Sequence, residues 1–405
     1  MNDAMNEMPM KAKQMPDTTS APRLLEGITV LDMSQFLSGP LAALRLADFG
    51  AEVIKIERPD GGDLCRRLYL SDTEIGGEST LFHAINRGKK SFAADLKTEI
   101  GLDEVRRLAA RADVVIQNFR PGVIERLGLD YATLAALNPR LVYGSITGYG
   151  TSGPWVARPG QDLLAQARSG LMWLNGDADQ GPVPFGLAVA DILAGHTLAE
   201  GILAGLVRRG ITGLGVHIET SLLEALVDLQ FEVLTTYLND GGRVPKRGNF
   251  RSAHAYLAAP YGVYATSDGW LAIAMAPLSQ LAGLLDLPDL GSFDGPRAFA
   301  ERDSAKTIIA GRVREQSTSH WLAILEPRDI WCAEVLDWPR LLESDAFRRL
   351  DMLQDVVAGE NTQVRTTRPG FRLDGQRPGT AKAAPRIGEH TEDIRRKWLE
   401  GPFDK

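Results

Sequence analysis

Apolar and polar positions follow two periods over the first half of the chain, and they predict strands separated by helices. Segments 28–33 and 52–57 are short apolar runs of the kind that forms buried strands. Between them, the segment from Pro40 to Gly50 has a helix pattern, with proline suited to the first turn and glycine to the end. Strand, helix and strand within about 30 residues predict a right-handed βαβ unit.

The same alternation continues toward residue 240. Segments 113–117 and 141–146 are predicted strands, and a helix is expected over 101–112. Residues 221–239 are predicted to form one long helix. The basic segment 86–91 is predicted to be a loop or hairpin. Together these elements predict an α/β fold.

The pattern changes after residue 240. Short strands are predicted at 263–266 and 270–275, and helices follow to about residue 334. Residues 368–390 are rich in proline, glycine and arginine, which favours an extended strap. Residues 1–23 have no apolar core of a signal peptide and are predicted to be a mobile tail.

One long apolar segment, residues 185–207, contains only three ionisable residues: Asp191, His196 and Glu200. Its apolar residues recur at steps of three and four, which predicts a helix from about Asp191. The segment alone favours Asp191 as the helix N-cap. A membrane span needs about 20 apolar residues, but the spread of ionisable residues and the glycines favour a core helix. The functional alternative is a nucleophile or base at the edge of a dry site.

Composition narrows the choice of partners. A length of 405 residues predicts two or three domains, and a net charge of −7 gives no overall attraction to nucleic acid. Hydrophobic content of 44% is that of a soluble protein, and no membrane partner is expected. Cys65 and Cys332 lack metal or redox spacing, which favours a reduced, cytoplasmic compartment. The histidines show no ligand spacing, so no metal is expected.

Two polar segments directly follow predicted strands: Arg58 follows 52–57, and 118–122 follow 113–117. Open α/β sheets bind ligands at the carboxyl ends of their strands, so a ligand site is predicted there. Residues 148–153 match the spacing G-x-G-x-x-G, but no long helix opens after them. A dinucleotide site is therefore rejected, and a flexible loop beside a site is predicted.

Several segments together resemble the class III CoA-transferases, the family that includes formyl-CoA transferase and carnitine CoA-transferase. They occur in the family's order and cover about Leu24 to Ile394. The segments are VLDMSQFLSGP, GAEVIKIERPDGGD, INRGKKSFAADLK, ADVVIQNFRPG, NPRLVYGSITGYGTSGP, GQDLLAQARSG, LAVADILAG, APYGVYATSDGW and APRIGEHTEDI.

The resemblance implies a Rossmann-like large domain over residues 24–225 and a smaller α+β domain over 226–334. It implies that a C-terminal segment, residues 335–405, returns to the large domain as a strap. It also implies an interlocked homodimer. Coenzyme A, carried as an acyl-CoA, is the implied substrate, together with a small carboxylic acid.

The resemblance further implies that Asp191 is the nucleophile. The implied CoA contacts are Leu37, Ser38, Arg58, Ala94, Asp95, Leu96, Lys97, Asn118, Phe119, Arg120, Arg126, Pro159, Gly160, Gln161 and Asp162. The CoA phosphates are expected on Arg58, Lys97 and Arg126. For Arg87, Lys89 and Lys90, a solvated surface and a phosphate site both stay open. The candidates for oxyanion donors are the backbone N–H groups of Gly148, Gly150 and Gly153.

In the implied reaction, Asp191 attacks the thioester to give a mixed anhydride and then an aspartyl-CoA thioester. Formyl-CoA transferase has glutamine where Leu37 stands and a glycine run that residues 248–254 lack. Oxalate and formate are therefore disfavoured, and the acyl specificity stays open. Succinyl-CoA and a small organic acid are suggested by analogy.

Two alternatives are retained. Racemases of this fold carry histidine immediately before the position of Asp162, whereas this chain has Gln161, and an amide cannot act as a general base. A CoA-binding protein without turnover would keep the basic contacts but would not require Asp191.

Overall fold

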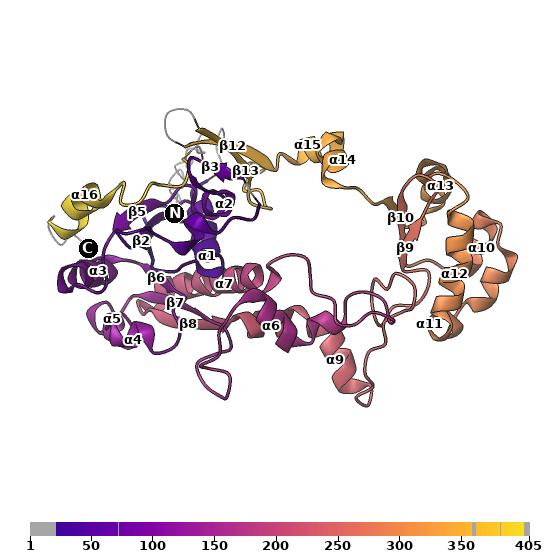
Figure 1. The fold of residues 1–405 in the computed structure, drawn as a ribbon, viewed down its shortest axis with the longest axis horizontal. Helices are drawn as coiled ribbons and strands as arrows, with labels where there is room; N and C mark the ends of the chain where they lie inside the picture. Colours follow the sequence, from indigo (N-terminus) through magenta and orange to yellow (C-terminus); the bar gives the residue numbers. More distant parts are fainter. Residues whose placement is uncertain (1–21, 72, 359–361, 381, 401–405) are drawn as a thin grey trace, which may run out of the picture.

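The computed structural model describes residues 22–71, 73–358, 362–380 and 382–400 (Figure 1). The predicted tail, residues 1–23, lies almost wholly outside this range. The chain runs from a large sheet along α9 (Phe231–Asn239) to a smaller unit, and it returns through α14 (Trp338–Glu343) and α15 (Asp345–Leu350).

The large sheet has six strands, all parallel, so the α/β prediction is confirmed. In chain order they are β1 (Thr29–Asp32), β2 (Glu52–Glu57), β5 (Lys90–Ala93), β6 (Val114–Gln117), β7 (Val142–Thr147) and β8 (Val216–Ser221). Their spatial order is β5-β2-β1-β6-β7-β8. The order reverses between β1 and β6, where doubly wound sheets bind their ligands.

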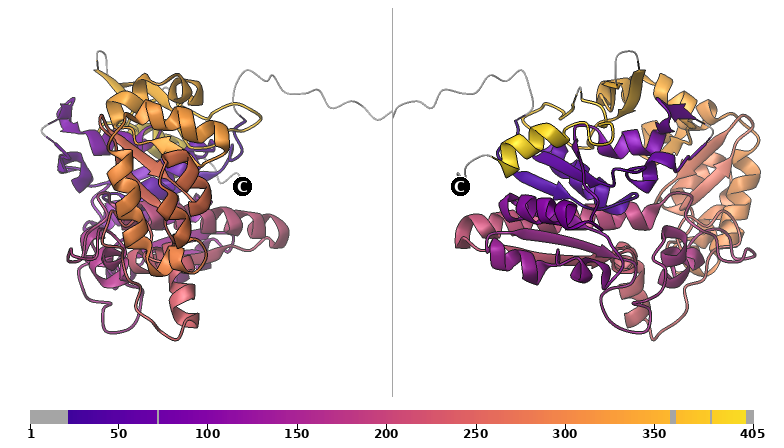
Figure 2. Two further views of the ribbon diagram at one scale, coloured as in Figure 1. Left: turned by 90° about the vertical axis from the view of Figure 1, so that its right-hand side faces the viewer. Right: turned by 60° about the vertical axis from the view of Figure 1, so that its left-hand side comes forward.

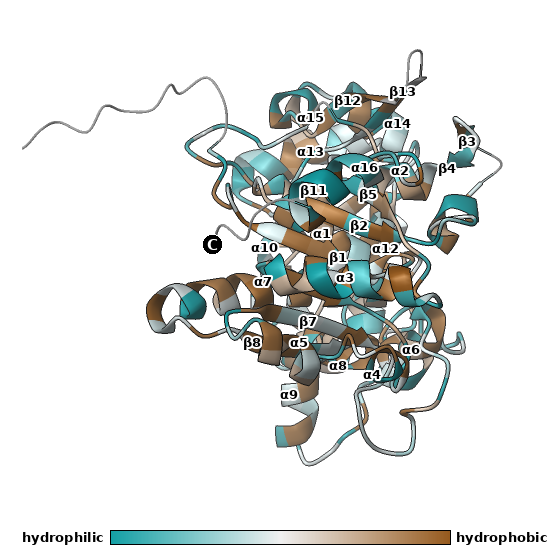
Figure 3. Ribbon diagram, turned by 90° about the vertical axis from the view of Figure 1, so that its left-hand side faces the viewer, coloured by the Kyte–Doolittle hydropathy of each residue, from teal (hydrophilic) through white to brown (hydrophobic). Residues whose placement is uncertain are grey.

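Helices cover both faces of this sheet. Neighbouring residues of β1 show the alternation, because Val30 packs with one apolar cluster and Leu31 with the other. The first face is covered by α1 (Ser38–Asp48), α6 (Asp162–Ser169), α7 (Val189–Thr212) and α8 (Leu222–Leu229). The second face is covered by α3 (Glu99–Arg111), α4 (Val123–Arg126), α5 (Tyr131–Leu137) and α16 (Thr391–Ile394). Figure 3 shows the apolar residues concentrated in β1 and β2.

Helix α7 packs closely on its neighbours through glycine, as its sequence predicts. A Cβ atom at Gly195 would lie 2.6 Å from the Ser38 carbonyl oxygen at the start of α1. At Gly201 it would lie 2.6 Å from Ile218 on β8. By length and composition α7 could cross a membrane, but its buried side, including Leu198 and Ile202, packs in the core cluster of the sheet.

The smaller unit has its own core. Its antiparallel sheet consists of β9 (Gly262–Ala265), β10 (Trp270–Ile273) and β11 (Cys332–Glu334). Its helices are α10 (Leu278–Leu285), α11 (Arg297–Ala300), α12 (Arg302–Val313) and α13 (Thr318–Leu325). Residues between 259 and 330 form one separate apolar cluster.

The C-terminal part lies against the exposed edge of the large sheet. After the hairpin β12 (Leu353–Ala358) and β13 (Thr362–Thr367), residues 385–391 run beside β5 (Figure 2). His390 N–H donates to the Ser91 carbonyl at 3.0 Å, and Ala93 N–H donates to Thr391 Oγ1 at 2.9 Å. These bonds satisfy backbone groups that an open sheet edge would leave unpaired.

Two predictions of local structure are wrong. Residues 86–91 are not a solvated loop: Asn86 ends α2 (Thr80–Asn86), Lys90 begins β5, and in the short turn between them Arg87 and Lys89 are buried. The hydrophobic pattern did not predict this strand, because basic residues stand at its start. Buried ion pairs stabilise these residues inside the fold. The helix predicted over 221–239 begins with the last residue of β8 and is broken at Gln230 into α8 and α9.

The close approach of α7 and α1 can be tested with two glycines of the same helix. Gly195→Ala places a methyl group against the Ser38 carbonyl, and we expect a loss of roughly 1–3 kcal/mol in the free energy of unfolding. Gly210→Ala meets no atom within 4 Å and should gain about 0.5–1 kcal/mol through helix propensity. Urea unfolding measures both. Equal effects of the two substitutions would contradict the packing described.

Candidate active site

Asp191 is the third residue of α7, in the turn where backbone N–H groups have no partner within the helix. It is not the N-cap, so that expectation is wrong: Ala188 occupies this position and its side chain makes no capping bond. The cap comes instead from Asp162. One oxygen of the Asp162 carboxylate accepts hydrogen bonds from Ala190 N–H at 2.7 Å and from Asp191 N–H at 3.3 Å.

The second oxygen of Asp162 accepts a hydrogen bond from Gln166 Nε2 at 2.7 Å, one turn further along α6. The same amide of Gln166 donates to the Leu187 carbonyl at 3.2 Å and accepts from Phe185 N–H at 2.9 Å. Both side chains are buried. The segment that leads into Asp191 is thus fixed to α6 by two neighbouring polar residues.

The surroundings of Asp191 make its carboxyl group unusually basic. Burial raises its pKa to about 6, and the negative charge of Asp162 adds to this effect. A hydrogen bond with Ser38 acts in the opposite direction. Above a pH of about 6 the group is therefore ionised, and it is a stronger base than an ordinary aspartate.

Ser38, which forms the hydrogen bond with the Asp191 side chain, is the first residue of α1. The turn before it, residues 34–37, is tied to the end of β6 by a pair of reciprocal hydrogen bonds. Gln35 N–H donates to Asn118 Oδ1 at 2.8 Å, and Asn118 Nδ2 donates to the Gln35 carbonyl at 2.7 Å. These bonds join the carboxyl ends of β1 and β6, the two strands between which the order of the sheet reverses.

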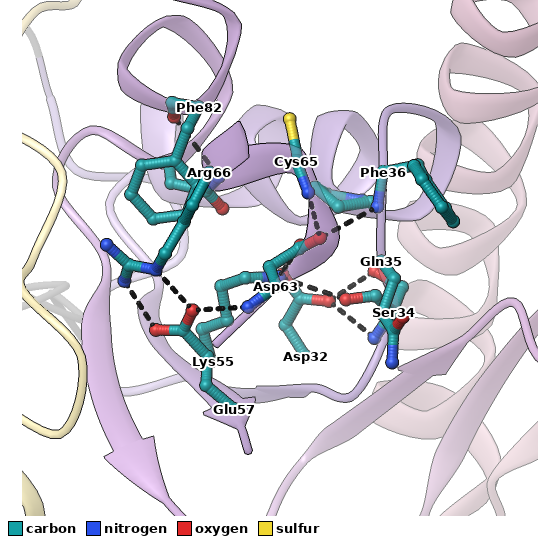
Figure 4. A network of polar contacts seen from close by, with 12 residues as sticks. Asp32, Ser34, Gln35, Phe36, Lys55, Glu57, Asp63, Cys65, Arg66 and Phe82 are labelled. Carbon is teal, nitrogen blue, oxygen red and sulfur yellow. Dashed lines mark hydrogen bonds and ion pairs between the residues drawn. The ribbon is translucent and has the colours of Figure 1, made fainter. Parts of the chain in front are cut away.

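A buried cluster of charged side chains holds the same turn, residues 34–37, in place (Figure 4). The Lys55 ammonium lies 2.8 Å from the Asp63 carboxylate and donates to the Ser34 carbonyl at 2.9 Å. Burial alone would lower the pKa of Lys55, but the charges of Asp32 and Asp63 outweigh it and raise that pKa. The Lys89 ammonium lies 2.9 Å from Asp32.

Most of the predicted CoA contacts lie along the carboxyl edge of the sheet. Arg58 follows β2, Ala94 to Lys97 follow β5, and Asn118 to Arg120 follow β6. A cavity of about 30 Å³ opens there. It is lined by Met33, Gln35, Ile56, Glu57, Arg58, Gly62, Asp63, Ala94, Leu96 and Phe119.

The basic residues singled out in the sequence fall into two groups, which lie at opposite ends of the strands. Arg58, Lys97, Arg120 and Arg126 are exposed, and none forms an ion pair with another residue in the described part of the chain. In contrast, the Arg87 guanidinium is buried 2.9 Å from Asp48. Arg87 and Lys89 are therefore structural ion-pair partners, and the suggestions of a solvated or phosphate-binding role are wrong for both. Lys90 is partly exposed and pairs with Glu52 at 2.6 Å.

The glycine loop after β7 touches the segment before α6. Gly148 and Gly160 meet backbone to backbone, since a Cβ at Gly148 would lie 2.5 Å from the Gly160 Cα. This contact brings Pro159 to Asp162 next to the loop. Gly150 N–H already donates to Thr147 Oγ1 at 2.9 Å, and Gly153 lies in the left-handed region with a φ of 86°. An oxyanion role for these glycines stays a prediction.

Gln161 acts as the N-cap of α6. Its side-chain oxygen accepts a hydrogen bond from Leu163 N–H at 3.1 Å. An amide in this place leaves the site without an ionisable base before Asp162. Among the described residues, no group of three His, Cys, Asp or Glu side chains could hold a metal ion.

Sequence reasoning missed Gln35, Gln166 and the Asp63–Lys55 pair. Gln166, Lys55 and Asp63 hold backbone segments, and the backbone of Gln35 is itself held by Asn118. A bond between residues far apart along the chain leaves no periodic signal. The reciprocal bonds of Asn118 were equally invisible, although its position after β6 was a clue.

Comparisons with known proteins agree with this geometry. Residues 25–391 match the family model described as CoA-transferase family III. The succinyl-CoA:glutarate CoA-transferase of Mus musculus is 34% identical, over 94% of this chain and 88% of that protein. The succinate–glutarate CoA-transferase of Agrobacterium fabrum is also 34% identical, over 94% and 97%.

The crystal structure of a CAIB/BAIF family protein from Brucella suis superposes with a TM-score of 0.80 at 32% identity. It covers 94% of this chain and 100% of that one. The match to the family model spans the sheet, the smaller unit and the returning C-terminal segment. The chain is therefore an enzyme of the CoA-transferase family III.

Proposed function

We propose that this enzyme moves CoA from an acyl-CoA to a carboxylic acid through covalent intermediates on Asp191. The observation that carries the proposal is the placement of this carboxylate at the start of α7. Asp162 bonds its backbone N–H, Ser38 bonds its side chain, and the carboxyl edge of the sheet lies beside it. A basic and partly buried carboxylate with one hydroxyl partner is suited to nucleophilic attack.

In the first half-reaction, an Asp191 oxygen attacks the thioester carbonyl carbon. The C–S bond breaks, and CoA leaves as a thiolate, which is acceptable because thiols ionise at a pKa of about 8.5. The thiolate then attacks the aspartyl carbonyl of the mixed anhydride. This step releases the donor acid as a carboxylate and leaves an aspartyl-CoA thioester.

The acceptor carboxylate reverses the sequence. It attacks the aspartyl-CoA carbonyl and displaces the thiolate, which then attacks the acceptor side of the new anhydride. The products are the new acyl-CoA and a free Asp191 carboxylate. No proton is transferred to carbon in any step, and this fits the amide of Gln161 rather than a general base beside Asp162.

The proposed substrates are short dicarboxylic acids, with succinyl-CoA as donor and an acid such as glutarate as acceptor. The names of the two relatives at 34% identity support this choice. The structure adds that Leu37 packs beside Cys65, Phe82 and Ile85, so its side chain offers no polar contact to the small, fully polar oxalyl group. We therefore disfavour oxalate and formate.

The exposed cations of the carboxyl edge are the proposed phosphate contacts. Arg58, Lys97 and Arg126 have no carboxylate partner to displace among the described residues. Guanidinium groups bind phosphate oxygens through paired hydrogen bonds. The cavity beside Arg58 and Phe119 has room for about one water molecule, so the CoA molecule would lie along this edge rather than inside the cavity.

Two rival functions predict different observations. A racemase would exchange the hydrogen on the carbon next to the thioester, and a CoA-binding protein would retain its ligand after Asp191→Ala and show no turnover as wild type. The absence of an ionisable residue at Gln161 argues against the first. The place of Asp191 argues against the second, because a protein that only binds CoA does not need a carboxylate held by Ser38 beside the carboxyl edge of the sheet.

We further propose that the enzyme is an interlocked homodimer in the cytoplasm. Large apolar side chains on α7, α9 and α14 are exposed in the single chain, including Ile211 at 80% and Trp338 at 79%. Phe231 and Leu238 of α9 are also exposed. Apolar surface of this extent is typical of an interface between subunits.

The nucleophile is tested by mass spectrometry after incubation with a panel of short acyl-CoAs. We expect a CoA-sized adduct on the peptide that contains Asp191, and hydroxylamine should convert this residue to a hydroxamate. Asp191→Ala should form neither and should lose at least about 10³-fold in kcat, while still binding CoA. The transferase proposal fails if no donor gives an adduct and solvent deuterium enters the acyl group.

The pH dependence of kcat/KM tests the role of Asp162. Wild-type activity should fall as the pH drops through about 6, because Asp191 becomes protonated. Asp162→Asn removes a negative charge but keeps an oxygen for the two N–H groups, so the pKa of Asp191 falls toward its ordinary value and the acid limb moves to lower pH. Glu200→Gln removes the same charge from the exposed side of α7 and should leave the profile unchanged. This role is refuted if the acid limb of the pH profile moves equally in both variants, or if it moves in neither of them.

Light scattering tests the dimer. We expect a particle of twice the subunit mass of 44.1 kDa. Because interlocked rings cannot separate without unfolding, tagged and untagged dimers should form no hybrids on mixing, whereas refolding them together should produce hybrids. A stable 44.1 kDa particle, or rapid hybrid formation, would count against the interlocked arrangement.

A further inference from the structure

The turn between β1 and α1 holds a phenylalanine in a backbone conformation that aromatic residues avoid. Phe36 has a φ of 62°, in the left-handed region. Most of the other non-glycine residues with positive φ in the described part of the chain are aspartates, which tolerate this region. Strained residues of this kind persist only where their surroundings fix them, and they concentrate at functional sites.

Two side chains, Asp63 and Asn118, fix the strained backbone through three hydrogen bonds. Phe36 N–H donates to Asp63 Oδ1 at 3.2 Å, and Asp63 is itself paired with Lys55. The preceding residue, Gln35, is clamped by Asn118 on both its N–H and its carbonyl. A network of polar residues, most of them buried, therefore holds this short turn in one conformation (Figure 4).

The chain covers Phe36 only in part. This residue is 44% exposed, and it belongs to none of the four apolar clusters of the described residues. Figure 4 shows it pointing away from the polar network. A strained backbone that presents an apolar ring to solvent is costly for folding alone, which indicates a partner outside the chain.

The position of the ring identifies that partner. The residue before it, Gln35, lines the cavity at the carboxyl edge of the sheet, beside Arg58 and Phe119. Two residues after it, Ser38 bonds the Asp191 side chain. Phe36 thus lies in the turn between a residue of the predicted CoA site and the residue that bonds the nucleophile, close to where the acyl carbons next to the thioester are expected.

We propose that Phe36 determines the acyl specificity of the enzyme: its ring packs on the acyl carbons next to the thioester and limits their number. This inference rests on the function proposed above. An apolar surface of fixed size discriminates by about tenfold or more for each methylene group. The same ring would also keep water from the mixed anhydride, whose hydrolysis breaks the acyl C–O bond, releases the free acid and wastes the thioester.

The experiment uses two variants that separate the ring from the strain. Phe36→Gly removes the ring and relieves the left-handed backbone, whereas Phe36→Ala removes the ring and keeps the strain. Leu137→Ala on α5 is the control, because it removes an exposed apolar side chain at the opposite end of the strands. For each protein, kcat/KM is measured with acetyl-, butyryl-, succinyl-, glutaryl- and hexanoyl-CoA. Release of free acid without an acceptor and the melting temperature are measured beside it.

We expect both Phe36 variants to move the ratio of kcat/KM for the longest donor to that for the shortest by tenfold or more in favour of the longest. Both should release free acid faster than wild type, and Leu137→Ala should change neither quantity. Phe36→Gly should melt at or above the wild-type temperature, so it remains informative if Phe36→Ala is unstable. An unchanged donor ranking in a folded Phe36→Gly enzyme overturns the inference and leaves the transferase proposal intact. Wild-type enzyme that transfers CoA from no donor and forms no adduct on Asp191 overturns both.

Discussion

The hydrogen bond from the start of α7 to the Asp162 carboxylate is the interaction on which the active site depends. It satisfies backbone groups that the helix leaves open, and it places a negative charge beside Asp191. Stabilisation and reactivity are thereby linked, because the group that caps the helix also raises the basicity of the nucleophile. An uncharged cap such as serine would stabilise the helix but would not raise the pKa of Asp191.

Buried charged residues hold the ends of the strands in place. Lys55, Asp63, Lys89 and Asp32 form a buried cluster below the turn that carries Phe36 and Ser38. Breaking one partner of a buried pair leaves an uncompensated charge, which typically costs about 3–5 kcal/mol. The turn therefore has little freedom to move, and the ends of β1, β2 and β6 act as a rigid platform. Flexibility for exchanging substrates must come from elsewhere.

The sequence predicted the parts of this structure that leave a local signal. The strand at 52–57 was predicted with its observed bounds, and the glycines of α7 were expected to allow close packing. The edge strand β5 was missed, because the basic residues at its start and just before it form ion pairs with Asp32, Asp48 and Glu52, far away in the chain. Asp191 was found as a candidate, but its cap was not, since only the fold brings Asp162 to it. The local pattern of apolar and polar residues predicts helices and strands. Whether a charged residue is buried depends on partners that lie far away in the chain.

The most direct measurement follows the oxygen atoms of Asp191. When the acceptor carboxylate attacks the aspartyl thioester and CoA then leaves with the acceptor acyl group, one acceptor oxygen stays on the enzyme. With an acceptor acid labelled with oxygen-18, the peptide containing Asp191 should therefore gain the label, and later turnovers should pass it to the released donor acid. Label in both places is the result that the mechanism requires. Turnover that leaves the Asp191 peptide unlabelled would show that the acyl group is transferred without this residue.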